Sequence, residues 1–164
     1  MGWIAKLLGA ASKDERGGAR FSAAPAWSVG PIKDAEAFFR ALPTFLPTSA
    51  ILYLEGVYAE DVIAFLRHHP IAHPLKLALG TIWPRPNYFH IPITSETMAE
   101  LAKLAEKHAE PEIATHIHAY HNDHILLEWH DAFSNPVRIS TTFSEARVRD
   151  FCESLHCAYK IEAA

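Results

Sequence analysis

Apolar positions between residues 31 and 157 recur with the spacing of amphipathic helices in four segments. Most of these segments carry cap or stop residues at their ends. Asp34 suits a first helical turn, Thr94 and Ser144 are typical N-caps, and Pro43 and Pro70 are expected to end helices, because proline cannot continue the hydrogen-bond ladder. The pattern therefore predicts helices over residues 31–43, 59–69, 94–105 and 144–157.

Extended segments fall into two groups, separated by helices. The first group covers residues 50–56, 75–81 and 88–94, and the second covers residues 112–121, 124–133 and 137–143. Five prolines from Pro70 to Pro92 indicate an edge or a rigid loop there, because proline donates no hydrogen bond to a sheet. The second group predicts a three-stranded meander near the C-terminus.

This order of elements favours an α+β fold with a mixed or antiparallel sheet and helices mainly on one face. We expect a single domain over residues 31–164. Residues 1–30 read as an apolar N-terminal segment followed by an irregular linker rich in Gly, Ser and Ala.

Composition narrows the class of protein. With 49% hydrophobic and 21% charged residues over 164 positions, the chain is expected to fold as a soluble globular domain. A net charge of −4 and the lack of a Lys/Arg cluster argue against nucleic-acid binding, and no apolar run approaches the roughly 20 residues of a membrane span. Cys152 and Cys157 are expected on different faces of the last helix as reduced thiols, which indicates a cytoplasmic protein.

Residues 112–133 read as a β-hairpin that holds five of the eleven histidines. A turn at Asn122 and Asp123 would pair His121 with His124. With a regular register, His121, His124 and His130 belong to a solvated face. The opposite, core-facing side then carries His116, His118, Tyr120, Ile125, Leu127, Trp129 and Asp131. If the pairing of the two strands shifted by one residue, His130 would instead face His116 and His118, and Asp131 would point to the other side of the hairpin.

The His-x-His pair suggests a metal site. His116 and His118 point to the same side of a strand with Asp131 diagonally opposite, and two histidines with a carboxylate can bind Zn²⁺ or Fe(II). His90 is a conceivable fourth member, and either His90 or Glu128 would then act as acid or base. The alternative is a groove without metal, in which His116 and His118 bond to the backbone, to Asp131 or to Tyr120.

The proline-rich segment offers a second candidate surface. Trp83 and Arg85 are favoured interface residues held between prolines. The alternative, which ranks ahead, is that Trp83 simply covers the core from a loop. The candidate groove or binding residues are thus His116, His118, Tyr120, Trp129, Asp131, His90, Trp83 and Arg85.

Two functional readings follow. The first is a small cytoplasmic binding or interaction protein, with a protein or small molecule as partner and a homo-oligomer as one arrangement. The second is a metal-dependent hydrolase-like enzyme that uses Zn or Fe. No GxGxxG, P-loop, HExxH or CxxC motif occurs, so we expect no cofactor under the first reading. We rank the first hypothesis ahead, because it does not require particular side chains to converge in an arrangement that the sequence cannot show.

Overall fold

One antiparallel sheet organises the protein. The computed structural model describes residues 17–21 and 25–163. In these residues seven strands follow the order β3-β2-β4-β5-β6-β1-β7, and every neighbouring pair is antiparallel. The predicted α+β class and the meander β4-β5-β6 are confirmed. The strands are β1 (Ala26–Gly30), β2 (Ile51–Glu55), β3 (Tyr88–Pro92), β4 (His116–His121), β5 (His124–Trp129), β6 (Val137–Ser140) and β7 (Ala158–Glu162).

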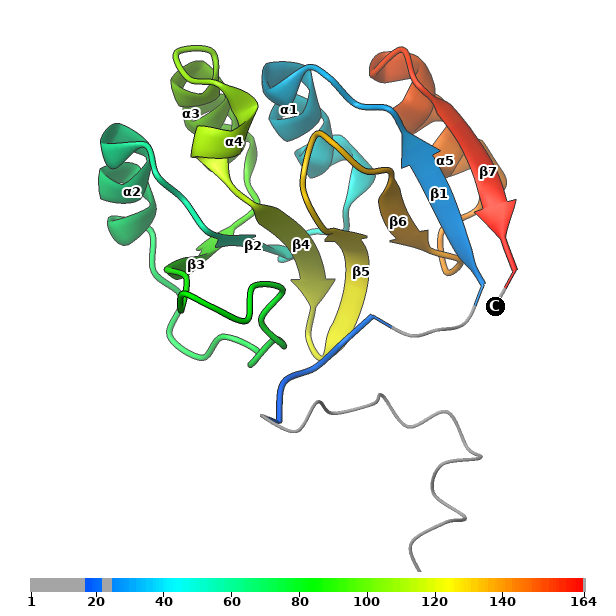
Figure 1. The fold of residues 1–164 in the computed structure, drawn as a ribbon. Coiled ribbons are helices and arrows are strands. Elements are labelled where there is room, and N and C mark those ends of the chain that lie inside the picture. Colours follow the sequence, from blue (N-terminus) through cyan, green and yellow to red (C-terminus); the bar gives the residue numbers. More distant parts are fainter. Residues whose placement is uncertain (1–16, 22–24, 164) are drawn as a thin grey trace, which may run out of the picture.

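The helices gather on one face of this sheet (Figure 1). Helix α1 packs between α3 and α5, and α2 packs on α3. The opposite side, which we call the helix-free face, is approached by residues 17–21 and by a covering loop, residues 68–87 (Figure 1). The helices are α1 (Ala35–Phe45), α2 (Glu60–Arg67), α3 (Ser95–Ala105), α4 (Glu110–Ile113) and α5 (Glu145–Ser154).

Side-chain caps fix where the longer helices begin. The side chains of Asp34, Thr94 and Ser144 each accept a hydrogen bond from a backbone N–H of the first turn. Thr94 and Ser144 are the N-caps that the sequence predicts, whereas Asp34, expected within the first turn, is the N-cap because α1 begins only at Ala35. Pro43 does not end α1, which continues to Phe45. A proline in the last turn removes few helical bonds, so the expected stop was wrong by one half-turn.

The two strands at the far edge were missed from the sequence. Residues 26–30, assigned to a linker, form β1 between β6 and β7, and the last strand β7 was not predicted. Neither strand alternates regularly between buried and exposed positions, so no period of two marked them in the sequence. The sheet therefore begins before residue 31. The expected strand at residues 75–81 makes only an isolated bridge between Leu77 and Ala19, and the predicted apolar segment at the N-terminus lies outside the described residues.

A bulge in the hairpin decides which side chains meet. His121 pairs with His124 as predicted, but Tyr120 pairs with Ile125 and Ala119 with Leu127, so Leu126 is an extra residue in β5. From Leu127 onward, every side chain of β5 therefore points to the face opposite to the one that a regular register predicts. The predicted placement of Leu127, Trp129 and Asp131 beside His116 and His118 is therefore wrong, and the one-residue shift is the arrangement found.

No helix within residues 17–21 and 25–163 combines the length and the apolar character needed to cross a bilayer.

Candidate binding site on the helix-free face

The helix-free face carries polar and aromatic side chains where the opposite face is apolar. Cross-strand pairing aligns Tyr53 with His90 and His118, and Glu55 with Tyr88 and His116. Their neighbours in sequence, such as Leu52 and Leu54, point to the helices, because side chains alternate along a strand. The face is formed by Tyr53, Glu55, Tyr88, His90, His116, His118, Tyr120, Glu128 and His130.

Glu55 ties the covering loop to the sheet. This carboxylate is fully buried and accepts hydrogen bonds from Tyr53 Oη at 2.7 Å, Gly80 N at 3.0 Å and Thr81 N at 2.7 Å. A buried carboxylate is tolerated only when such donors replace water. Glu55 therefore fixes residues 80–81 over β2.

His116 supports the same part of the loop. Its Nδ1 accepts the Asp131 N–H at 3.0 Å, so in the neutral ring the proton lies on Nε2, which meets Thr81 Oγ1 at 3.2 Å. Burial lowers the pKa of His116 and favours this neutral ring. Gly80 packs directly on it, because a Cβ at that position would lie 2.4 Å from His116 Cδ2.

His118 is held by the backbone of β5. Its side chain is 3% exposed, and its Nδ1 accepts the Trp129 N–H at 3.3 Å. The ring stacks on Tyr53, with ring centres 5.4 Å apart and planes 2° from parallel. Burial lowers the pKa of His118 to about 4, so the ring is neutral at pH 7.

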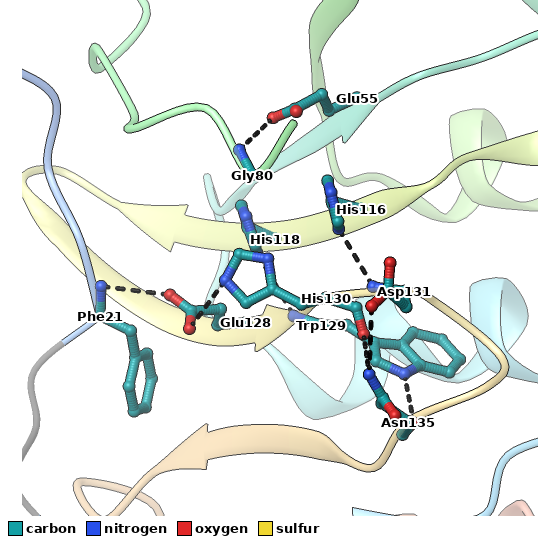
Figure 2. Close-up of polar contacts among 10 residues, drawn as sticks. All are labelled: Phe21, Glu55, Gly80, His116, His118, Glu128, Trp129, His130, Asp131 and Asn135. Atoms are coloured by element: carbon teal, nitrogen blue, oxygen red, sulfur yellow. Dashed lines mark hydrogen bonds and ion pairs between the residues drawn. The ribbon is translucent and has the colours of Figure 1, made fainter. Parts of the chain in front are cut away.

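Glu128 and His130 lie side by side on this face (Figure 2). His130 Nε2 lies 3.1 Å from Glu128 Oε1, and Phe21 N–H donates to Glu128 Oε2 at 3.3 Å. Burial acts to raise the pKa of Glu128, but the hydrogen bond from His130 and the nearby histidines outweigh it, so the pKa is lowered. That hydrogen bond also raises the pKa of His130. The His130 ring centre lies 5.0 Å from those of His116 and His118.

The geometry contradicts the predicted metal site. The part of the chain that the structure describes contains no group of three or more His, Cys, Asp or Glu arranged to hold a metal ion. Asp131 meets His116 through its backbone N–H, and its carboxylate accepts from Asn135 Nδ2 at 3.4 Å (Figure 2). The ligand set of His116, His118 and Asp131 is therefore wrong, because the bulge at Leu126 displaces Asp131.

Trp129 is not a groove residue either. It is fully buried on the helix-covered face, where its ring lies 4.9 Å from Phe38, and its Nε1 donates to Asn135 O at 2.7 Å. Trp83 is 85% exposed and lines neither of the cavities of this face.

Two cavities lie between the helix-free face and the segments that cover it. The larger has a volume of about 420 Å³ and the smaller about 260 Å³. Ala78 and Leu79 of the covering loop line both and stand between them. The smaller cavity is lined by His118, Glu128 and His130, among others. The larger is lined by residues 74–79, which include Lys76, and by Gly18, Tyr53, Arg85, Tyr88 and His90.

The floor of the larger cavity is aromatic and uncharged. The Tyr53 ring lies 5.0 Å from His90 and 6.1 Å from Tyr88. Burial lowers the pKa of His90 to about 4. Its Nδ1 shares a hydrogen bond with Tyr120 Oη at 3.0 Å, and that oxygen accepts the Leu75 N–H at 3.2 Å, which links the floor to the loop.

The structure thus brings together His90, His116, His118, Tyr120 and Arg85 from the predicted set. Sequence reasoning missed Tyr53, Glu55 and Tyr88, and it placed His130 here only under the one-residue shift; the preferred register put His130 on the solvated face, which was wrong. Tyr53 and Glu55 alternate with leucines in the segment ILYLE, and this period of two was the available signal.

The fold and the site define an α+β protein whose sheet carries helices on one face and a loop-covered, histidine-rich cavity region on the other. No match was found to a protein-family model, to a curated protein or to a solved structure.

Proposed function

We propose that this chain is a cytoplasmic binding protein that takes a small molecule into the larger cavity. The cavity itself carries the proposal. Its volume of about 420 Å³ lies within the range of roughly 300–1,000 Å³ that is typical of small-molecule sites.

The lining favours a flat ring that bears an anionic group. Tyr53, Tyr88 and His90 offer ring faces and edges, on which an aromatic ligand can stack. Arg85 and Lys76 supply cationic groups at the same cavity, and a guanidinium can pair with both oxygens of a carboxylate or sulfonate. Leu75, Leu77 and Leu79 make the remaining wall apolar.

The attachment of the covering loop supports a site formed before binding. Glu55 holds residues 80–81, and Tyr120 holds Leu75, so both sides of the loop segment over the cavity are tied to the sheet. A site that needs little ordering loses less of its interaction energy on binding. A roofed cavity of this kind suits a small molecule better than a protein surface, and a homo-oligomer stays a prediction from the sequence.

The proposal is tested with 1-anilinonaphthalene-8-sulfonate, which has aromatic rings and one anionic group. We expect one molecule to bind per chain in calorimetry. Leu79→Trp should abolish binding by filling the cavity. Arg85→Gln should weaken binding about tenfold or more, because a hydrogen bond to a charged group contributes about 1.5–3 kcal/mol.

Arg149→Gln serves as the matched control, since Arg149 lies exposed on α5 and lines no part of the cavity. This variant should bind like the native protein. Unchanged affinity in both cavity variants, or no bound probe in the native protein, would contradict the proposal.

A further inference from the structure

The end of α5 has the hydrogen bonds of a Schellman motif. Cys157 N–H donates to Cys152 O at 3.0 Å, and His156 N–H donates to Glu153 O at 3.3 Å. His156 has a φ of 51°, in the left-handed region that the first residue after such a helix end adopts. Leu155 is the C-cap between helix and turn.

This motif places two particular side chains in contact. The residue three positions before the C-cap and the residue two positions after it commonly touch, and these positions are Cys152 and Cys157. Cys152 is 2% exposed and belongs to the core, and Cys157 is half-buried against it. The expectation that the two thiols project from different helix faces was wrong, because α5 ends at Ser154 and Cys157 lies beyond it.

A direct interaction between the thiols agrees with this geometry. Cys152 Sγ donates to Ala158 O at 4.0 Å, next to Cys157 in the chain. The neighbouring thiol raises the pKa of Cys152 and lowers that of Cys157, although burial acts to raise both. Cys157 is also the more exposed of the two. It is therefore the thiol better able to react first.

We propose that Cys152 and Cys157 are a redox-active pair that forms a reversible disulfide between the end of α5 and the start of β7. The oxidant is a small disulfide such as oxidised glutathione. The Cys157 thiolate attacks one sulfur of that disulfide, forms a mixed disulfide and releases one thiolate. The Cys152 thiolate then attacks the sulfur of Cys157 and releases the second. The protein loses two protons and two electrons, and the small disulfide becomes two thiols.

This site is independent of the proposed ligand cavity. The sheet order places β7 at one edge, whereas the cavity lies over β2 and β3 at the other. A failure of either proposal thus leaves the other standing.

The experiment equilibrates the full chain in glutathione redox buffers, quenches with acid, alkylates free thiols and maps the peptides by mass spectrometry. We expect an intramolecular link between Cys152 and Cys157. Its equilibrium constant should be at least about tenfold larger in the folded protein than in urea, because the turn holds the thiols together. Equal constants in the two states, or an end product with glutathione still on Cys157, would overturn the proposal.

Substitution of His156 tests the role of the turn. His156→Gly keeps the left-handed conformation and should preserve the folded-state constant. His156→Val disfavours that conformation, so it should lower the folded-state constant while leaving the value in urea unchanged. An equal constant in the folded Gly and Val variants would count against the geometry. If the Val variant does not fold, the proposal is still tested by the disulfide equilibrium constant of the native protein, compared between buffer and urea.

Discussion

The two faces of the sheet are buried by different means. On the helix-covered face, Trp129 and Phe38 pack with other apolar side chains, and their burial depends on volume and area. On the helix-free face, Glu55, His116 and His118 are equally buried, but under a loop. There each polar group depends on a particular partner.

The difference shows what a buried polar face requires. Among the described residues, no buried side-chain nitrogen or oxygen lacks a hydrogen-bond partner. When an apolar contact is lost, the folded protein loses only part of its packing energy. When a buried donor or acceptor loses its partner, the folded protein bears the full free-energy cost of removing that group from water. The stability contributed by the helix-free face should therefore depend more on pH and on small changes of geometry than that of the helix-covered face. It should depend less on side-chain volume.

The largest effect should come from removing volume on the helix-covered face. Phe38 is fully buried and its ring meets Phe39, Trp129 and Phe151. Phe38→Ala should lower the free energy of unfolding by about 3–5 kcal/mol, measured by urea denaturation. Phe38→Leu, which keeps most of the volume, should cost clearly less. Equal losses in the two variants would show that packing volume is not what this face depends on.

A drop in pH should act mainly on the helix-free face. The pKa of His118 falls from an ordinary value of 6.5 to about 4, so between these values the unfolded chain binds a proton that the folded chain does not. Stability then rises with pH. The contribution of His118 is complete above pH 6.5 and is lost as the pH falls towards 4, by up to about 3 kcal/mol. His90 acts in the same direction.

Urea denaturation between pH 4 and 7 measures this slope. His118→Gln should flatten it, whatever its effect on absolute stability. His124→Gln is the control, because the side chain of His124 is 81% exposed, and it should keep the native slope. Identical slopes in all three proteins would refute the link to His118.

The smallest effect concerns the contact between loop and sheet. Gly80→Ala places a methyl group against the His116 ring and should destabilise the protein by about 1–3 kcal/mol. In a His116→Ala background the same change should cost less, because the ring is gone. A double-mutant cycle measures this coupling. Additive losses would mean that Gly80 is required for another reason.

Much of the fold could be predicted from the sequence, because caps and apolar periods act locally. Thr94 and Ser144 mark helix starts, and Asn122 with Asp123 marks the hairpin turn. The candidate site could be predicted only in part. His116, His118 and His90 stand out by residue type. Whether Glu128 and His130 or Asp131 join them depends on the bulge at Leu126, which is apolar like its neighbours and gives no sign of being unpaired.

The position of β1 has a consequence for how the chain folds. Ala26 pairs with Ser140 on one side and with Glu162 on the other, so the first strand of the sheet receives both neighbours from the last part of the chain. Contacts so distant in sequence form slowly, because a long loop must close first. During synthesis, β1 must remain unpaired until β6 and β7 have left the ribosome, and a chain truncated before β6 would leave this strand with neither partner.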